Sequence, residues 1–303
     1  MSAAVETKDA AKATIAVAIT VYRPDGLALE ALAARFLAAG YPVYLHVDGP
    51  VGEAIEATDL ARLRALAGAR IALAPRNAGI GAGLNRLAEA AERDGCNRVL
   101  FFDQDSLPAP DLPERLLQAF RELEGLGLRP AVVGPRPVSP PGGGSKPPRY
   151  RRRDGVASVG ACRPVDYVIT SGSLVSLAAW HEIGAFAERY RMDAIDVEWG
   201  FRAWRRGRSV WVLDTAEMPH QIGSGILRWG PIAFPDQNPA RMRTYVRNQF
   251  DMLRLAHVPL GWKLRTLVYV PLQAAVYAAK SGHGKRRAGL DLLRAAFEGL
   301  GGR

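Results

Sequence analysis

Apolar residues in the first third of the chain alternate between two spacings. Thr14 to Val21 is almost continuously apolar and β-branched, which predicts a strand buried on both faces of a sheet. Apolar residues three and four positions apart then predict a helix that ends near Gly40. This alternation continues to residue 102. It predicts strands at 14–21, 43–47, 70–74 and 98–102, separated by helices at 29–40, 60–66 and 81–94.

The second half of the chain has a less regular pattern. Pro135 to Arg153 combines prolines, consecutive glycines and arginines, which predicts an irregular loop or lid. Beyond Gly225 the pattern is helical, basic and aromatic, and no further strand is expected there. Further helices are predicted at 111–123, 178–186 and 196–206, and further strands at 131–134, 165–177 and 209–213.

Strands that alternate with helices through short loops predict an α/β fold with an open, mostly parallel sheet. In such a sheet the ligand binds beyond the carboxyl ends of the strands. Those ends carry polar residues in this chain, among them Tyr22, Asp48, Asn77 and Asp103. The sequence therefore predicts a binding site along this edge.

Composition excludes several other classes. The chain has 303 residues, of which 48% are hydrophobic and 23% charged, so it is neither a disordered chain nor a collagen. Only Cys96 and Cys162 are present, which excludes a disulfide framework. The N-terminal apolar run lacks a basic flank, and no stretch reaches the length of a membrane span. We expect a cytoplasmic protein.

Basic residues outnumber acidic ones and give a net charge of +10. They gather in Arg149 to Arg153 and in the stretch from Arg228 to Arg303. Such a charge suits nucleic acid, phosphates or anionic lipid as partners. The aromatic residues between these cations favour either a membrane interface or a helical cap over the preceding domain.

An Asp-x-Asp motif follows one of the buried strands. Asp103 and Asp105 are separated by one residue at the binding edge, where two carboxylates could hold Mg²⁺ or Mn²⁺ and leave positions for a diphosphate. His220 follows a later strand and could complete the metal shell. The alternatives are a solvated turn for the two acids and an ordinary surface or core position for the histidine.

A cluster of acids precedes a predicted helix. Asp193, Asp196 and Glu198 could cap this helix and interact with its dipole. One of them could instead be a general base that takes a proton from an attacking hydroxyl. The sequence leaves both interpretations open.

Taken in order, these motifs resemble the inverting family 2 glycosyltransferases and, within them, the bacterial rhamnosyltransferase-like branch. The resemblance spans residues 15 to 250. It rests on the strand and turn at 18–25, His46-Val47-Asp48-Gly49, Arg76 to Gly81 with Asn85, the Asp103-Gln104-Asp105-Ser106 motif, Thr170 to Leu174, the Asp-x-x-Asp-x-Glu-Trp series at 193–199 with Arg202, and His220.

The resemblance implies a GT-A fold, which is a nucleotide-binding, mostly parallel sheet flanked by helices. The catalytic domain would span 1–225, with a nucleotide-sugar-binding part at 14–135 and an acceptor-side part at 160–225. A helical, basic C-terminal region would span 226–303.

The implied activity is inverting transfer of a sugar, with dTDP-rhamnose as the expected donor, to a cell-surface polysaccharide or lipid-linked glycan. Asp196 would be the base, and Asp193 and Glu198 remain competitors. A Mg²⁺ or Mn²⁺ ion would be held by Asp103, Asp105 and His220. The donor would contact Thr20, Tyr22, Asp48, Asn77, Gly79, Asn85, Asp103 and Arg247, and the acceptor side would include Ser171, Gly172 and Trp199.

Two other functions are compatible with parts of the sequence. A sugar-phosphate nucleotidyltransferase would use a related sheet and metal, but Tyr22 to Gly26 is a poor match to its glycine-rich phosphate loop. A non-catalytic nucleic-acid-binding protein would explain the charge but not the acids at the strand ends. We therefore expect no nucleic acid partner, and we expect contact with the inner surface of the cytoplasmic membrane through the C-terminal region.

Overall fold

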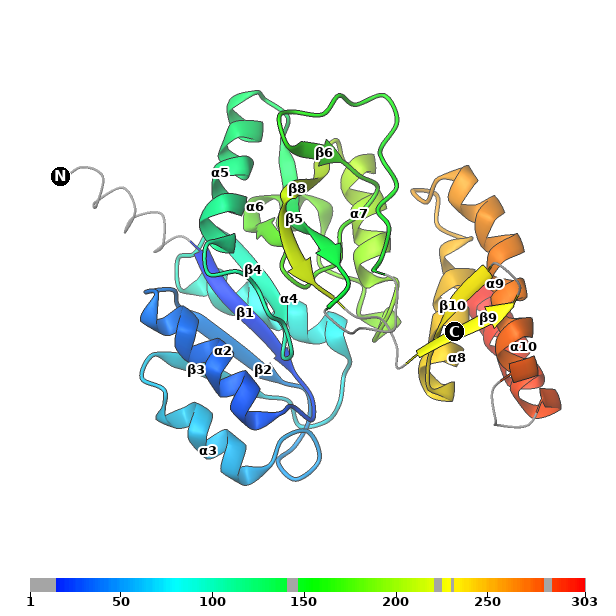
Figure 1. Ribbon diagram of the computed structural model, residues 1–303, viewed down its shortest axis with the longest axis horizontal. Helices are drawn as coiled ribbons and strands as arrows, with labels where there is room; N and C mark the ends of the chain where they lie inside the picture. The colour runs from blue at the N-terminus through cyan, green and yellow to red at the C-terminus, as the bar shows by residue number, and fades with distance from the viewer. Residues whose placement is uncertain (1–14, 141–146, 221–224, 230–231, 281–284, 303) are drawn as a thin grey trace.

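The chain folds around one large sheet, with a lobe of C-terminal helices beside it (Figure 1). The computed structural model describes residues 15–140, 147–220, 225–229, 232–280 and 285–302. Its strands are β1 (Ile15–Val21), β2 (Val43–Val47), β3 (Ala69–Leu73), β4 (Arg98–Asp103), β5 (Pro130–Val138), β6 (Cys162–Pro164), β7 (Leu174–Ser176), β8 (Ser209–Pro219), β9 (Gly225–Trp229) and β10 (Ile232–Asp236).

The helices connect and cover these strands. They are α2 (Gly26–Ala38), α3 (Ala57–Ala65), α4 (Ile80–Arg93), α5 (Leu112–Gly125), α6 (Leu177–Ile183), the short 3₁₀ helix η1 (Glu188–Tyr190), α7 (Ile195–Arg205), α8 (Pro239–Met252), α9 (Leu260–Lys280) and α10 (Lys285–Gly301).

The large sheet has eight strands in the order β3-β2-β1-β4-β7-β5-β8-β6. The four strands from β3 to β4 are parallel, as the alternating sequence pattern predicts. The short strand β7 lies antiparallel between β4 and β5, and β6 is antiparallel to β8. The predicted mixed α/β fold with a mostly parallel sheet is confirmed.

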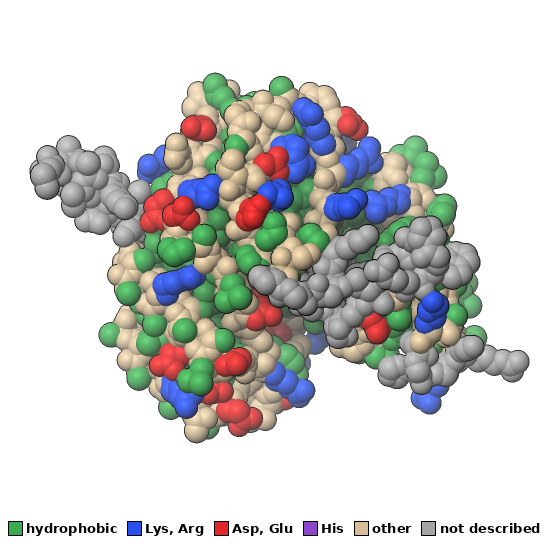
Figure 2. Space-filling view, viewed as in Figure 1, with side chains coloured by type: hydrophobic (Ala, Val, Ile, Leu, Met, Phe, Trp, Pro, Cys, Tyr) green, Lys and Arg blue, Asp and Glu red, His purple; other side chains and the backbone are tan. Residues whose placement is uncertain are grey.

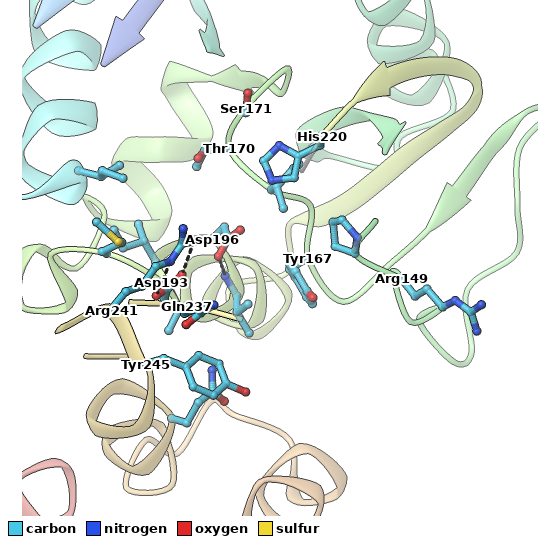
Figure 3. A pocket seen from close by; sticks show the side chains of 18 of the residues that line it. Arg149, Tyr167, Thr170, Ser171, Asp193, Asp196, His220, Gln237, Arg241 and Tyr245 are labelled. Atoms are coloured by element: carbon cyan, nitrogen blue, oxygen red, sulfur yellow. Dashed lines mark hydrogen bonds and ion pairs between the residues drawn. The ribbon is translucent and has the colours of Figure 1, made fainter. Parts of the chain in front are cut away.

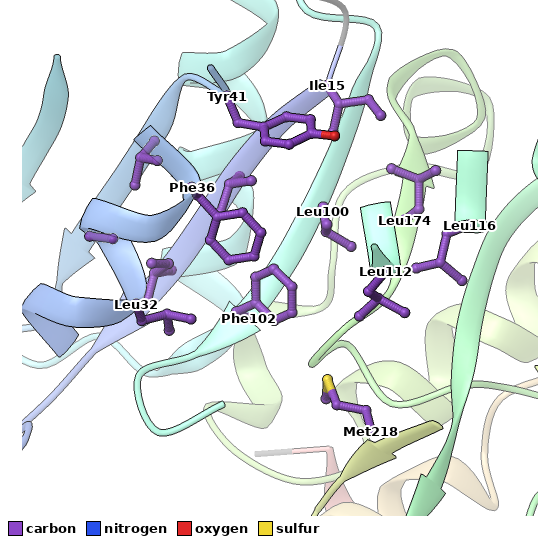
Figure 4. Packing of buried hydrophobic residues seen from close by; sticks show 14 of the residues in the cluster. Ile15, Leu32, Phe36, Tyr41, Leu100, Phe102, Leu112, Leu116, Leu174 and Met218 are labelled. Atoms are coloured by element: carbon purple, nitrogen blue, oxygen red, sulfur yellow. The ribbon is translucent and has the colours of Figure 1, made fainter. Parts of the chain in front are cut away.

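Alternate residues of β1 belong to two hydrophobic cores on opposite faces of the sheet. Val17 and Ile19 pack with α2, α3 and α5, and Figure 4 shows part of this core, with Phe36 and Phe102 stacked at 5.1 Å. Ala16 and Ala18 pack with α4, α6 and α7. Burial on both faces is why this strand has an apolar sequence without alternation.

The C-terminal helices share a third, smaller core. Met242 and Val246 of α8 pack with Val270 and Tyr277 of α9 and with Leu292 of α10. The expectation that no strand follows residue 225 is wrong, because β9 and β10 pair there as an antiparallel hairpin. Short strands of this kind lack a clear period, and Pro235 within β10 disguises it further.

Two other predicted segments differ from the structure. The predicted strand at 165–177 is reduced to β7, because the chain turns at Thr170 to Ser173, where the Ser173 N–H donates to the Thr170 carbonyl. The predicted loop at 135–153 begins later than expected, since β5 continues to Val138, and residues 141–146 lie outside the described part. Both cysteines are free and buried.

Candidate active site

One glutamine joins the ends of two neighbouring strands. The backbone N–H of Tyr22 donates to Gln104 Oε1 at 2.7 Å, and Gln104 Nε2 donates to the Tyr22 carbonyl at 3.0 Å. Thr20 and Asp103 are partners in the parallel register of β1 and β4. The middle residue of the Asp-x-Asp motif therefore fixes the turn after β1 against the acids after β4.

Asp103 and Asp105 line a cavity that His220 and Arg241 also line. Burial raises the pKa of Asp103 to about 6, and the neighbouring carboxylate of Asp105 contributes to this rise. Asp105 is exposed and Asp103 is half-buried, and two neighbouring carboxylates that repel each other create the electrostatic condition that a divalent cation relieves. The structure thus brings the predicted acids together at the binding edge.

The predicted metal ligands are not assembled as a complete set. Within the described ranges, no three His, Cys, Asp or Glu side chains lie close enough together to hold a metal ion. Asp103 and Asp105 nevertheless fit a hard cation that also takes diphosphate oxygens. His220 lies beside them, and burial and Arg241 lower its pKa despite the opposing effect of Asp105, so its imidazole is neutral at pH 7.

The loop before α7 has an uncommon backbone. Arg191, Asp193 and Ala194 have φ angles of 53°, 54° and 67°, a region that residues other than glycine rarely adopt. Each such residue lowers the free energy of unfolding by about 1 kcal/mol or more, so contacts from outside the loop must stabilise the loop. Asn248 of α8 supplies them, because its Nδ2 lies 3.0, 2.6 and 3.0 Å from the carbonyl oxygens of residues 190, 192 and 193.

Arg241, also on α8, binds the side chain of Asp193. Its guanidinium donates from Nη2 to Asp193 Oδ1 at 2.9 Å and from Nε to Oδ2 at 3.4 Å. Figure 3 shows this pair at the floor of the cavity. The charge of Asp193 is therefore compensated, which makes this carboxylate a weaker candidate for a free general base.

Asp196 lies in the first turn of α7 and lines the same cavity as Asp103. Its Oδ1 accepts a hydrogen bond from the N–H of Val197 at 2.8 Å. Burial raises the pKa of Asp196 to about 7, and the charges of Asp193 and Asp103 add to the effect. A carboxylate with a pKa near 7 at the wall of a cavity is suited to accept a proton.

Glu198 is the third acid of the cluster, and its side chain points elsewhere. It is 2% exposed, both of its oxygens accept hydrogen bonds from Arg202 at 2.9 Å, and His257 Nε2 lies 2.8 Å away. Burial alone would raise the pKa of Glu198, but the contacts with His257 and Arg202 hold it below its usual value. Glu198 links α7 to the segment before α9, so we do not assign it as the base.

Trp199 does not lie on the acceptor side of the cavity. It is 3% exposed, its Nε1 donates to the Gly184 carbonyl at 3.0 Å, and its ring packs 5.2 Å from that of Phe186. The prediction of an acceptor contact at Trp199 therefore needs correction. Successive residues of a helix point in different directions, so Asp196 faces the cavity whereas Trp199 faces the core.

Ser171 and Gly172 lie on the turn next to the strand end that carries Asp103. The Ser171 hydroxyl accepts from the Asp103 N–H at 3.3 Å and lies 2.8 Å from the Ser106 hydroxyl. Gly172 has a φ of 80°, and a Cβ there would come within 2.6 Å of Met218 Sδ. Ser171 thus holds the backbone of Asp103 and also lines the cavity, and the acceptor contacts of Ser171 and Gly172 stay a prediction.

Asp48 binds the backbone of the next strand-end turn. Its two carboxylate oxygens accept from the N–H groups of Ala78 and Gly79 at 2.7 and 2.9 Å. Asn77 Oδ1 accepts from Arg191 at 2.8 Å, which links this turn to the loop before α7. Three of the predicted donor contacts, Asp48, Asn77 and Gly79, are therefore connected by hydrogen bonds to one another's turn or to the loop before α7. Both carboxylate oxygens of Asp48 already accept hydrogen bonds from the backbone.

Asn85 and Arg247 also hold backbone segments. The amide of Asn85, which is 3% exposed, exchanges hydrogen bonds with the backbone of Phe186 at 2.9 and 3.0 Å. Arg247 donates to the Arg189 carbonyl and to Asn248. Both side chains support the loop before α7, and neither is among the residues that line the cavity, so their contact with the donor stays a prediction.

The C-terminal helices contribute a wall of the cavity that the sequence analysis did not assign to the site. The cavity has a volume of about 400 Å³ and is lined from α8 by Arg241, Tyr245 and Gln249, and from α9 by Trp262, Arg265, Tyr269 and Gln273. On each helix these residues are three or four positions apart, which places them on one face. That spacing of polar and aromatic residues was the signal available in the sequence.

Comparison with known proteins finds a related sequence among curated proteins. No protein-family model matches the chain. A curated relative, the dTDP-rhamnosyl transferase RfbF of Shigella flexneri, is 28% identical over 196 residues, which cover 64% of this chain. The matched region spans 66% of that relative, slightly less than two thirds of its length. The predicted resemblance to rhamnosyltransferase-like enzymes is thereby confirmed.

Solved structures match over most of the chain. The S. aureus TarS fragment 1–349 has a TM-score of 0.54 at 13% identity. The match covers 95% of this chain and 81% of the TarS fragment. GalNAc-T7, solved with UDP, GalNAc and Mn²⁺, has a TM-score of 0.55 at 12% identity. This match covers 84% of this chain and 54% of the GalNAc-T7 chain. The fold is of the GT-A glycosyltransferase type. In this sheet, Asp103 at the carboxyl end of β4 and His220 directly after β8 line the cavity.

Proposed function

We propose that the protein is an inverting glycosyltransferase in which Asp196 is the general base. The observation that carries this proposal is the position of Asp196. Its carboxyl, with a pKa raised to about 7, lines the same cavity as the Asp103 carboxyl at the end of β4. A general base and a site for a metal-bound diphosphate on one cavity are the parts that displacement at an anomeric carbon requires.

In the proposed reaction, the hydroxyl of the acceptor attacks the anomeric carbon of the donor sugar. Asp196 accepts the hydroxyl proton while the bond from that carbon to the diphosphate oxygen breaks, so the configuration inverts and no enzyme-bound sugar forms. Arg241 keeps Asp193 neutralised, which limits the negative charge around the base. A divalent cation held by Asp103 and Asp105 would neutralise charge on the departing diphosphate.

For the donor we propose dTDP-rhamnose. The support is the 28% identity to the Shigella flexneri relative, which is a dTDP-rhamnosyl transferase. Thr20 and Tyr22 at the end of β1 are the proposed nucleoside contacts, next to the acids that would face the diphosphate. The GalNAc-T7 structure contains UDP and Mn²⁺, which supports a metal-dependent nucleotide-sugar site, and we propose Mg²⁺ or Mn²⁺ here.

For the acceptor we propose a cell-surface polysaccharide or lipid-linked glycan, reached from the cytoplasmic face of the membrane. In the described part of the chain, no helix combines the length and the apolar character needed to cross a bilayer. Two helices instead leave apolar side chains on their surface. These are Leu260, Leu264, Leu267 and Val268 on α9 and Leu290, Leu293, Phe297 and Leu300 on α10.

The exposed apolar residues recur three, four or seven positions apart, so each set lies on one face of its helix. Figure 2 shows hydrophobic side chains along the outer edge of the C-terminal lobe. Lys263 and Arg294 lie on the same two helices, and cations beside an apolar face suit an anionic lipid surface. We propose that these faces rest on the membrane.

Vesicle binding tests this contact. The protein should sediment with phosphatidylglycerol vesicles more than with phosphatidylcholine vesicles, and Leu264→Gln combined with Phe297→Gln should reduce sedimentation. Leu126→Gln replaces a comparably exposed leucine after α5 and is the matched control. Equal sedimentation of the double variant and the control would contradict the membrane contact.

Calorimetric titration tests the proposed function. We expect binding of dTDP-rhamnose that requires Mn²⁺ or Mg²⁺, and weaker binding of UDP- and GDP-sugars. Asp105→Ala should weaken the metal-dependent part, whereas Asp111→Ala, which removes an exposed acid before α5, should not. If the folded protein binds none of these nucleotide sugars with either metal, the proposed function is wrong.

A further inference from the structure

Three buried polar atoms in the wall of the active-site cavity have no hydrogen-bond partner among the described residues. They are Gln237 Oε1, Trp262 Nε1 and Gln273 Oε1. Gln237 is 9% and Gln273 is 4% exposed. An unpaired polar group of this kind costs about 1 to 3 kcal/mol, so three of them on one cavity indicate a ligand that supplies the missing partners.

The type of these atoms indicates what the ligand offers. Two carbonyl-type acceptors and one indole donor complement hydroxyl groups, each of which both donates and accepts. Aromatic rings surround them, and the Tyr167 and Trp262 rings meet edge to face at 6.0 Å. Tyr245 and Tyr269 line the same wall (Figure 3 labels Tyr167 and Tyr245). Rings for the apolar face and amides for the hydroxyls suit a pyranose.

Cations complete this side of the cavity. Arg151 is paired with Asp154 and lies 3.9 Å from Asp166. Arg149 and Arg265 also line the cavity, and neither forms an ion pair with a carboxylate of the described residues. The guanidinium of Arg265 instead lies over aromatic rings. Figure 3 shows the side chain of Arg149 directed away from Asp196 and Tyr167, so Arg265 is the cation that faces this wall without an ion pair to a described residue, and it indicates an anion on the ligand.

We propose that α9 and residues 148–151 form the acceptor subsite and bind a pyranose that carries an anionic group. The ring would pack on Trp262, its hydroxyls would bond to Gln237 and Gln273, and the anion would lie beside Arg265. This inference rests on the proposed function and adds the acceptor class to it. The anion could be a phosphate or a carboxylate, which share this chemistry and which the test separates.

Because Asp196 lines the same cavity, a ring held on this wall would share that cavity with the base. The subsite also gives the basic, aromatic C-terminal region a role in the reaction. Trp199, the acceptor residue expected from the sequence, is in the core, and Trp262 takes its place in this proposal.

Saturation-transfer NMR with three small probes tests the subsite. The probes are glucose 1-phosphate, methyl glucuronide and methyl glucoside, each added to the full chain without a nucleotide sugar. We expect a signal from at least one charged probe that exceeds the signal of methyl glucoside. The stronger of the two charged probes identifies phosphate or carboxylate as the recognised group. Arg265→Gln should abolish the excess, and Arg294→Gln on α10 should not.

Gln273→Leu distinguishes a ligand-binding role from a structural one. Leucine has a similar volume and leaves no unpaired oxygen, so the thermal midpoint should stay the same or rise, while binding of the charged probe should weaken by about tenfold. Gln118→Leu on the exposed side of α5 is the control. A lower midpoint of Gln273→Leu would show a structural role and overturn the assignment.

Other outcomes also overturn the inference. They are the absence of any probe signal, equal signals from charged and neutral probes, and unchanged probe binding in Gln273→Leu. Calorimetry with dTDP-rhamnose and Mn²⁺ on the same protein samples separates this result from the proposed function. Donor binding without probe binding would contradict the subsite but not the proposed function. Probe binding without donor binding would contradict the proposed function but not the binding site for the charged pyranose.

Discussion

The guanidinium of Arg241 lies 2.9 Å from the carboxylate of Asp193, three residues before Asp196. An ion pair between α8 and the loop before α7 thus neutralises one of the two acids that the sequence leaves as competing bases. Asp196 has no ion pair of this kind with a described residue, and its pKa rises to about 7. The ion pair of Asp193 and the burial of Asp196 together give the two neighbouring acids different chemistry.

We expect Asp196→Asn to lower kcat by about 100-fold or more while leaving the Kd for the donor nearly unchanged, because the amide cannot accept the proton. Steady-state rates and calorimetry measure the two effects. In the native protein, kcat should rise with pH through about 7, since the base must be deprotonated.

Asp193→Asn is the matched control for this assignment. It should lower activity through the loop but preserve the rise of the rate near pH 7. If that rise persists in Asp196→Asn and disappears in Asp193→Asn, the base is Asp193.

The same Asp196→Asn variant should be more stable than the native protein at alkaline pH. Folding raises the pKa of Asp196 from 3.8 to about 7, so the stability contribution of this group is fully present below pH 3.8 and is lost as pH rises from there through 7. After allowance for solvent, we expect the variant to gain about 1 to 2 kcal/mol in the free energy of unfolding at pH 8.

Urea denaturation at two pH values measures this gain. At pH 4 the difference between variant and native protein should be much smaller than at pH 8. An equal difference at both pH values would mean that ionisation of Asp196 is not its source.

Asn248→Asp should weaken the support of the loop before α7. Asn248 is 0% exposed, and its amide lies against three carbonyl oxygens, which a carboxylate would repel. We expect a loss of about 1 to 3 kcal/mol in the free energy of unfolding and a lower kcat. Urea denaturation of Asn97→Asp, at an exposed position, gives the control value. Equal losses in both variants would contradict this role of Asn248.

Two glycines with similar φ angles but different surroundings allow backbone strain to be distinguished from steric contact. Gly52 has a φ of 85° and open space where a Cβ would lie, whereas Gly79 has a φ of 97° and its Cβ would come 2.6 Å from Arg191 Cα. Gly52→Ala should cost about 1 kcal/mol of stability without loss of activity. Gly79→Ala should cost more and also lower kcat, because it displaces the loop. Thermal midpoints and rates that match in the two variants would contradict this.

The alternation of apolar patterns was sufficient to predict the parallel part of the sheet. Residues of β1 are apolar on both faces, and Leu29 to Phe36 of α2 repeat with a helical period, so local physics alone defines these elements. The position of Asp103 and Asp105 at the binding edge follows from the same rule, because parallel strands end at one edge.

The roles of single side chains were not predictable in this way. Asn85, Arg247 and Trp199 are polar or aromatic residues within motifs, and only their partners show that they hold backbone segments or the core. The β9–β10 hairpin was missed for a related reason, since its pairing depends on two short segments meeting each other.

The sequence by itself determined the alternating strands and helices, the edge at which the acids gather and the basic character of the C-terminal region. The tertiary structure decided which acid is compensated and which is free, through Arg241, and which helices close the cavity, through Trp262 and Gln273. The physical reason is that periodicity records burial along one element, whereas pKa values and cavity walls depend on groups brought together from distant parts of the chain.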